Sequence, residues 1–388
     1  MINFNDIKYE RVDLEKTKRK INILFKKLNK VKNYDEYYKI IKSINNIQLH
    51  IEEMCDYADI KNMRNLNDEF YKEEMDYWNE YKPKLDTLFI PYYNEIKNSK
   101  YKKELKKAMP DIFFKMIEQN KLASEKNNEL IKSEKELQGK YKDLNKTKIL
   151  YDGEEKTIRE IGAFCSDKDR KIRKKAHDAI NDFYYKNKDE YNNILFELVK
   201  IRNKIAKNLG YKNYAEYSIY LLKRFGYDYT DISKFRNNVK EYITPLCKKI
   251  SNWQKEKLKL DKLEYYDTVL FEEMPKLKYT GLDLLNELRK SIKKIDKDLS
   301  KLYNNMLDNG YIDLVQSDSK VNFGITNYLS KRGLPTITGN YRNQYRDIVT
   351  TMHEFGHSFQ KYNASKEDKN YIVTPLLKYP TFEVAEIF

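Results

Sequence analysis

The sequence is poor in the residues that build disulfide frameworks and tight turns. Its 388 residues include 3 cysteines, 11 glycines and 8 prolines. The cysteines, Cys55, Cys165 and Cys247, are far apart and odd in number. This excludes a disulfide framework and a cysteine-based metal site, and it favours a reducing, cytoplasmic environment. Of the two interpretations open for Cys165, a reactive thiol and a buried inert one, we favour the second.

Long apolar runs are also absent. No stretch approaches the ~18 residues that a membrane helix needs, and the N-terminus lacks the apolar segment of a signal peptide. We therefore expect no membrane contact. The low glycine and proline content argues against an all-β protein with many tight turns.

Aromatic and charged residues are abundant instead. Aromatics make up 14% of the chain, with 34 Tyr and 17 Phe, charged residues make up 35%, and the mean hydropathy is −0.87. Disordered chains are poor in aromatics, so this composition predicts a folded, polar and mostly α-helical protein.

Basic residues outnumber acidic ones, giving a formal net charge of +15. Such an excess is compatible with nucleic-acid binding. The basic residues are interleaved with acidic residues along the whole chain. Lys, Asn, Ile and Tyr are also abundant together, which is the composition that codon bias in an AT-rich genome produces. We therefore attribute the charge to composition and expect no nucleic-acid partner.

Apolar periodicity predicts where the helices lie. Two or three helices are expected over residues 11–98, further helices over 110–140 and 157–260, one over 281–307 and a last one over 345–363. Gly210 and Gly226 are expected to stop helices. Residues 262–280 are expected to be irregular.

Short β-prone segments interrupt this pattern. Asp152-Gly153 between two such runs predicts a hairpin, and Thr157 with Glu160 predicts a capping box at the helix that follows. Strands are expected at 322–328 and 334–340. We place a domain boundary near the hairpin, with a helical N-terminal arm at 1–145 and a second domain at 146–388.

The chemistry lies in the last predicted helix, which contains His353-Glu354-Phe355-Gly356-His357. Two histidines four residues apart share one helix face, so both imidazoles can bind one zinc ion. Glu354 is placed to take a proton from water activated by that metal. The chain has only 4 histidines, and two of them stand in this motif, which makes a chance match improbable.

A third zinc ligand is needed. The extended motif with a third histidine is excluded, because Gln360 and Asn363 stand at the corresponding positions. The alternative is a glutamate from a following helix, for which the chain offers Glu383 and Glu386. Being three residues apart, both can face the first helix, one binding zinc and the other holding a ligand imidazole.

Three segments resemble the M3 family of zinc oligopeptidases, and within it the oligoendopeptidase F branch. They are residues 334–341, 347–359 and 379–387, the last resembling the family's Glu-x-x-Ser third-ligand helix. The resemblance is strong over about 330–388, weaker over 150–330, and limited to helical character before that. It implies a mostly α, gluzincin-type metallopeptidase with a small β-sheet beside the His-Glu-x-x-His helix.

Carried over by position, the resemblance implies one Zn²⁺ per chain bound by His353, His357 and Glu386. Glu354 would be the general base and Glu383 a residue that supports the ligands. The strand at Thr336, Ile337, Thr338 and Gly339 would offer backbone groups at a sheet edge to an extended peptide. The implied activity is cleavage of short peptides.

One departure from the family pattern is large. The chain ends at Phe388, two residues after Glu386, so the Ser of Glu-x-x-Ser and the family's C-terminal helices are not in this sequence. We therefore expect an incomplete catalytic domain, a fragment with little activity alone or one completed by a separate chain. Two other functions stay open: an inactive peptidase-like protein that binds peptides, and a basic helical nucleic-acid binder. The sequence does not indicate an oligomeric state.

Overall fold

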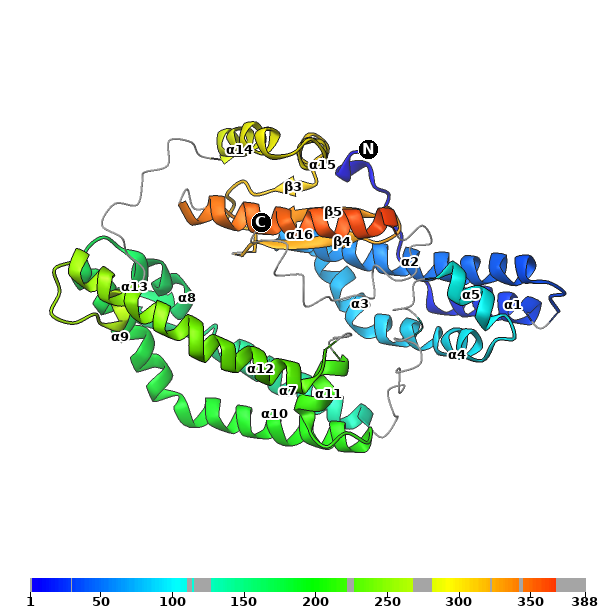
Figure 1. The fold of residues 1–388 in the computed structure, drawn as a ribbon, viewed down its shortest axis with the longest axis horizontal. Coiled ribbons are helices and arrows are strands. Elements are labelled where there is room, and N and C mark those ends of the chain that lie inside the picture. The colour runs from blue at the N-terminus through cyan, green and yellow to red at the C-terminus, as the bar shows by residue number, and fades with distance from the viewer. Residues whose placement is uncertain are drawn as a thin grey trace. The chain divides into compact units, whose positions relative to one another are not determined.

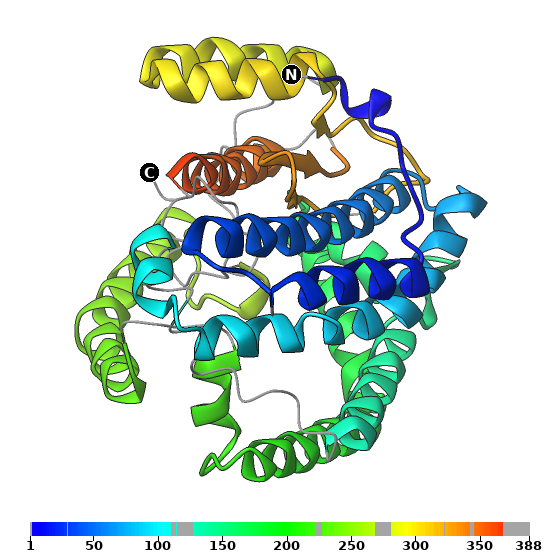
Figure 2. The ribbon, with the colours of Figure 1, turned by 90° about the vertical axis from the view of Figure 1, so that its right-hand side faces the viewer.

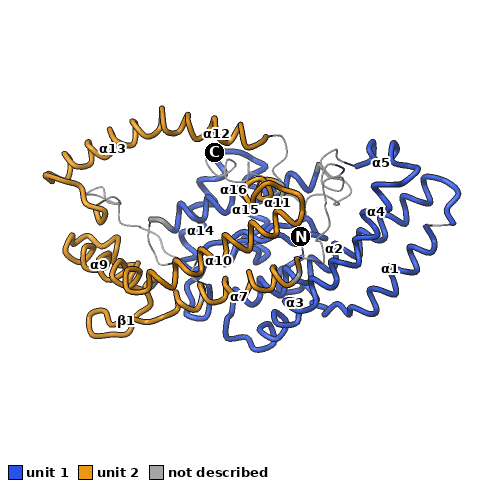
Figure 3. The backbone as a smooth tube through the Cα atoms, turned by 90° about the horizontal axis from the view of Figure 1, so that it is seen from below, with its two compact units in different colours: residues 1–120, 276–388 blue, residues 121–275 orange. Residues whose placement is uncertain are grey.

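The structure is a computed structural model that describes residues 2–28, 30–109, 114, 127–221, 227–267, 281–321, 323–341 and 345–367. The chain forms two compact units, unit 1 with residues 1–120 and 276–388 and unit 2 with residues 121–275 (Figure 3). These units do not follow the predicted boundary near 145. N-terminal residues such as Tyr57 share one apolar core with Ile337 and Phe355, so packing joins the two ends of the sequence in unit 1.

Helices dominate both units, as predicted (Figures 1 and 2). In unit 1 they are η1 (Phe4–Asp6), α1 (Leu14–Leu28), α2 (Tyr34–Arg64), α3 (Glu69–Thr87), α4 (Ile90–Asn98), α5 (Lys102–Ala108), α14 (Gly281–Ile295), α15 (Lys297–Asp308) and α16 (Tyr345–Glu367). In unit 2 they are α7 (Asn128–Leu144), α8 (Ile158–Ile161), η3 (Gly162–Ser166), α9 (Arg170–Lys186), α10 (Lys188–Asn208), α11 (Tyr214–Leu221), α12 (Tyr229–Asn238), the π-helical turn η4 (Val239–Ile243), α13 (Thr244–Lys257) and η5 (Tyr265–Asp267).

A three-stranded sheet lies at the centre of unit 1. Its strands are β3 (Ile312–Asp313), β4 (Ile325–Leu329) and β5 (Leu334–Thr338), in the order β3-β5-β4. β5 pairs parallel with β3 and antiparallel with β4. Both α16 and α2 pack on β4 and β5. Thr326 of β4 contacts Glu354 of α16, whereas Thr338, on the opposite face of the sheet, accepts a hydrogen bond from Arg64 of α2.

Two apolar cores hold unit 1 together. One joins α1 to α5 and includes Trp78, whose side chain is 1% exposed. The other lies between the sheet, α14, α15, α16 and the second half of α2. The sheet and α16 are thus supported by helices from both ends of the sequence.

Several predicted elements are confirmed and some differ. The last helix is present as α16, and the two predicted strands are β4 and β5 with shorter bounds. The single helix expected over 281–307 is wrong, because Asp296 adopts an extended conformation and its side chain caps α15 by accepting from the backbone N–H of Asp298 and Leu299. Residues 11–98 form four helices rather than two or three.

Unit 2 contains the predicted hairpin, formed by β1 (Lys148–Tyr151) and β2 (Glu154–Thr157). Asp152 and Gly153 both have positive φ, as a tight two-residue turn requires, and the capping box of Thr157 and Glu160 is present. Gly210 has a φ of +83° just after α10, which confirms this helix stop. Gly226 and most of 110–126 and 268–280 lie outside the described residues.

A buried carboxylate anchors the end of unit 2. Asp267 has a side chain that is 0% exposed and accepts hydrogen bonds from Arg170 at 2.9 and 2.8 Å and from Arg173 at 3.3 Å. The hydrogen bonds from Arg170 are the largest cause of the lowered pKa of Asp267. Within the described ranges, none of the helices is both long and apolar enough to cross a bilayer.

Candidate metal centre on the last helix

The two histidines of the motif lie side by side on α16. Their ring centroids are 4.9 Å apart, with an angle of 80° between the ring planes. His357 is buried, with 6% of its surface exposed, and His353 is partly exposed. Two imidazoles in such proximity could supply two of the four ligands of a tetrahedral zinc site, and their nitrogen donors suit zinc. The chemistry of this donor pair therefore fits the implied metal.

Glu354 follows His353 directly, and its surface is 7% exposed. The Oγ1 of Thr326 lies 2.7 Å from Glu354 Oε2 and 2.8 Å from the Glu354 backbone oxygen, so its single proton is donated to one of these oxygens at a time. Ser358 Oγ donates to the same backbone oxygen at 2.9 Å. Strand β4 thus holds the carboxylate of Glu354 in place from across the sheet–helix interface.

Gly324, just before β4, allows this close contact. A Cβ at Gly324 would lie 2.6 Å from Thr350 Cγ2 and 3.5 Å from Glu354 Cγ. A Cβ at Gly339, at the end of β5, would lie 3.4 Å from the Cα of Gly324. The two glycines therefore face each other across the strand pair, and the absence of side chains lets the sheet approach the turn of α16 that carries Glu354.

Apolar packing fixes the orientation of α16. Phe355, on the side of the helix that faces the core, is 2% exposed and makes an edge-to-face contact with Tyr303 of α15 at 5.1 Å. Thr351 Oγ1 donates to the backbone oxygen of Asp347 and is also hydrogen bonded to Tyr341. These contacts determine which face of the helix presents His353 and His357.

The remaining predicted metal residues cannot be placed in the same way. Glu383 and Glu386 lie outside the described residues. Across the part of the chain that the structure describes, there is no group of three His, Cys, Asp or Glu side chains that could hold a metal ion. The structure therefore brings together His353, Glu354 and His357, and the third ligand stays a prediction.

The expectation that Thr336, Ile337, Thr338 and Gly339 form an open sheet edge is wrong. β5 is the central strand, flanked by β3 and β4. The N–H of Ile337 donates to the Tyr311 oxygen at 2.8 Å and that of Gly339 to the Asp313 oxygen at 3.0 Å. Thr336 and Thr338 pair with β4.

The outer strand of the described sheet is β4. Lys361 Nζ of α16 donates to the backbone oxygen of Thr326 at 3.1 Å, on the side of β4 that faces away from β5. Gly324, Thr326 and Lys361 were not predicted as site residues. The only sequence signal for them is a glycine directly before a short β-prone run.

Comparison with known proteins identifies the relatives of this chain. Residues 4–123 match the peptidase M3 N-terminal domain, and residues 163–388 match peptidase family M3. The oligopeptidase PepF of Bacillus subtilis is 26% identical over 220 residues, which cover 55% of this chain and 32% of that protein. The chain thus aligns with about a third of this curated relative's length.

Solved structures of peptidases are also similar to this chain. A protein described as an oligoendopeptidase F from Bacillus anthracis is 31% identical with a TM-score of 0.86, and the match covers all of this chain and 71% of that one. PZ peptidase A, solved with an inhibitor, is 29% identical with a TM-score of 0.83, covering 92% of this chain and 65% of that one.

Proposed function

Because the chain belongs to peptidase family M3, we propose that it contributes the catalytic centre of a zinc-dependent endopeptidase that hydrolyses short peptides. The observation that carries this proposal is the pair of imidazoles, 4.9 Å apart on α16, next to a carboxylate held by Thr326. The relatives are oligopeptidases by name, which supports the substrate class.

In this proposal His353, His357 and Glu386 hold one zinc ion per chain, and Glu383 supports a ligand imidazole. A bound zinc ion polarises the scissile carbonyl and lowers the pKa of water. His357, buried in α16, supplies a ligand whose position is fixed by the helix. His353 is partly exposed, which leaves one side of the proposed site open to a substrate.

Glu354 acts as the general base. Its carboxylate accepts the proton of the attacking water and passes it to the nitrogen of the leaving amine. The hydroxyl of Thr326, 2.7 Å from Oε2, orients the carboxylate so that the other oxygen is directed at the water. Burial of Glu354 excludes bulk water that would compete for the same hydrogen bonds.

The substrate is proposed to bind as an extended strand along β4. β5 is paired on both sides, so it cannot accept a further strand, whereas β4 is the outer strand of the described sheet. Lys361 donates to the backbone oxygen of Thr326 on the side of β4 that faces away from β5. In this proposal the peptide backbone lies along that side, near Glu354.

Glu354→Gln tests the proposal. In a protein that includes the family's C-terminal helices, the variant is expected to retain one zinc per chain, measured by atomic absorption, and to lose hydrolysis of a quenched fluorescent peptide. Glu69→Gln, at an exposed position in the first turn of α3, is the matched control and should behave like the wild type.

Undiminished hydrolysis by Glu354→Gln would contradict the assignment of the base. If the wild-type protein with the C-terminal helices bound zinc and peptide without any cleavage, it would instead be the inactive, peptide-binding protein considered above.

A further inference from the structure

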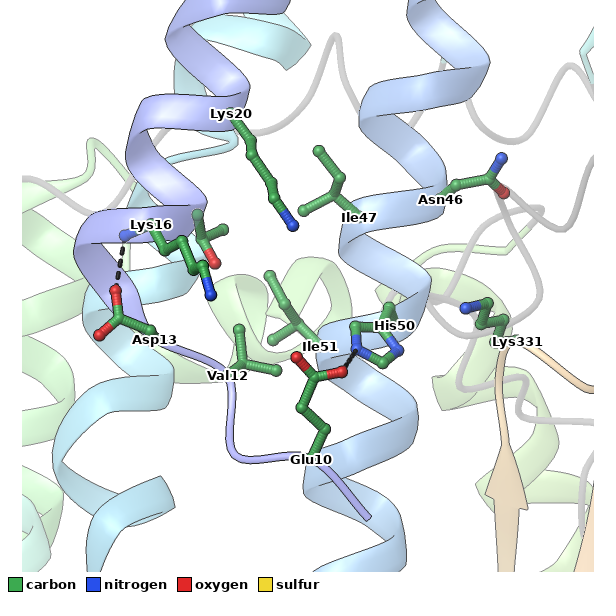
Figure 4. A pocket seen from close by; sticks show the side chains of 11 residues that line it. Glu10, Val12, Asp13, Lys16, Lys20, Asn46, Ile47, His50, Ile51 and Lys331 are labelled. Atoms are coloured by element: carbon green, nitrogen blue, oxygen red, sulfur yellow. Dashed lines mark hydrogen bonds and ion pairs between the residues drawn. The ribbon is translucent and has the colours of Figure 1, made fainter. Parts of the chain in front are cut away.

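A second candidate site lies in unit 1, in a pocket with a volume of about 250 Å³ (Figure 4). Three parts of the fold enclose it: the start of the chain through α1, the middle of α2, and the turn that joins β4 to β5. The lining residues are Glu10, Val12, Asp13, Lys16, Thr17, Lys20, Asn46, Ile47, His50, Ile51 and Lys331.

Three ammonium groups line this pocket, from Lys16 and Lys20 of α1 and from Lys331 of the β4–β5 turn. Figure 4 shows Lys16 and Lys20 reaching from α1 into the space between the helices. Within the described ranges, none of the three ammonium groups forms an ion pair or a hydrogen bond with another residue of the chain. Like charges collected without partners repel one another, and a bound anion would relieve this repulsion.

The two acidic residues of the pocket are already engaged. Asp13 Oδ1 accepts from the backbone N–H of Lys16 at 2.6 Å. Glu10 Oε2 lies 3.6 Å from Nε2 of His50, and the Glu10 side chain is 73% exposed to solvent. Neither carboxylate contacts an ammonium group of the pocket, and three lysines stand against two carboxylates, so the lining keeps a net positive charge.

The pKa of His50 reflects its burial and the positive charges of the nearby lysines. Its pKa is lowered, chiefly by burial and then by the positive charge of Lys331, with a smaller effect of Lys20, while Glu10 acts in the opposite direction. The Nδ1 atom of His50 is buried and has no hydrogen-bond partner among the described residues. An imidazolium would leave this donor unsatisfied, so His50 is neutral near pH 7 and adds no charge.

We propose that this pocket binds a small oxyanion of the phosphate class, held by Lys16, Lys20 and Lys331. Lysine suits such a ligand as a mobile point charge. The apolar side chains of Val12, Ile47 and Ile51 line the same space, while Lys16, Lys20 and Lys331 are exposed and can turn their ammonium groups toward a ligand. With a volume of about 250 Å³, the pocket is large enough for an anion of phosphate size.

The bound anion bridges segments that are distant in sequence. Lys331 precedes Arg332, which donates from its backbone N–H to Glu53 of α2 at 2.8 Å. The same turn connects β4 and β5, which pack against α16. A ligand that joins this turn to α1 stabilises the native state of unit 1 and raises its melting temperature, by an amount that grows with the logarithm of the ratio of ligand concentration to Kd.

The test uses the histidine signals of the intact chain. With only 4 histidines, the imidazole ¹H–¹³C correlations resolve each site separately. Inorganic phosphate, titrated at constant ionic strength, is expected to shift the His50 signal saturably while His177, in unit 2, does not move. Lys20→Gln and Lys331→Gln should each weaken phosphate binding about tenfold, as loss of one charged hydrogen bond implies.

Lys18→Gln is the matched control, because Lys18 is an exposed residue of α1 that does not line the pocket. It should leave the affinity within about twofold of the wild type, well below the tenfold loss of a charged contact. Equal weakening by Lys18→Gln, unchanged binding by Lys20→Gln and Lys331→Gln, or a response confined to His353 and His357 would each overturn the proposal. All four signals are independent of peptidase activity.

Discussion

Gly324→Ala tests whether the glycine before β4 sets the distance between the sheet and α16. The new Cβ would lie 2.6 Å from Thr350 Cγ2, well inside van der Waals contact. Thr350 is β-branched and helical, so its side chain cannot easily rotate away. Overpacking costs about 1–3 kcal/mol, and the stiffer unfolded chain returns ~0.4–1 kcal/mol, so we expect a net loss of about 1–2 kcal/mol.

Tryptophan fluorescence measures this loss in unit 1 alone. The chain has 2 tryptophans, and Trp253→Phe leaves only the buried Trp78 as a reporter of urea unfolding. In this background Thr350→Ser removes the methyl group that the new Cβ meets, so it should recover most of the loss caused by Gly324→Ala. A loss of equal size with Ser at 350 would refute the steric explanation.

Three further predictions concern other residues. Thr326→Val should lower kcat by roughly 10- to 100-fold with zinc retained, because Glu354 loses a charged hydrogen bond of ~1.5–3 kcal/mol, whereas Thr326→Ser should preserve activity. Asp267→Asn should destabilise unit 2 by ~3–5 kcal/mol at pH 7 in circular-dichroism melts. Because the pKa of Asp267 is lowered in the folded state, the difference in unfolding free energy between wild type and Asp267→Asn should shrink as the pH falls through that pKa. Ellman's reagent should label Cys247 rapidly, since it is exposed, and spare Cys55, whose pKa burial raises to about 12; Cys247→Ser should remove the fast phase.

The shared helix face of His353 and His357 could be predicted from the sequence because its geometry is local. The i, i+4 spacing of His353 and His357 fixes their shared face once the segment is helical, and the helix is evident from its apolar pattern. The same holds for the hairpin at Asp152 and Gly153, where two positive φ values need particular residues.

Contacts between distant segments could not be predicted. Thr326 is 28 residues from Glu354, and Arg64 is 274 residues from Thr338, so no local period links them. β5 is the central strand because β3 pairs with it. β3 has only two residues, too few to show the alternation of apolar and polar residues that predicts a strand. For this reason the sequence alone places β5 at the edge of the sheet.

The break in the helix expected over 281–307 was closer to being predictable. Asp296 is a good N-cap residue, and it stands directly before the acidic first turn of α15. Apolar residues recur at helical spacing through both α14 and α15. Because this spacing is not interrupted at Asp296, the sequence pattern reads as one helix.

The most direct test of the metal centre is zinc affinity, measured by competition with a chromogenic chelator. The wild-type protein is expected to bind one zinc ion, and His353→Ala and His357→Ala should each lose it. His177→Ala, in α9 of unit 2, replaces a histidine outside the motif and should bind zinc like the wild type. If His353→Ala bound zinc as tightly as His177→Ala does, α16 would not be the metal centre.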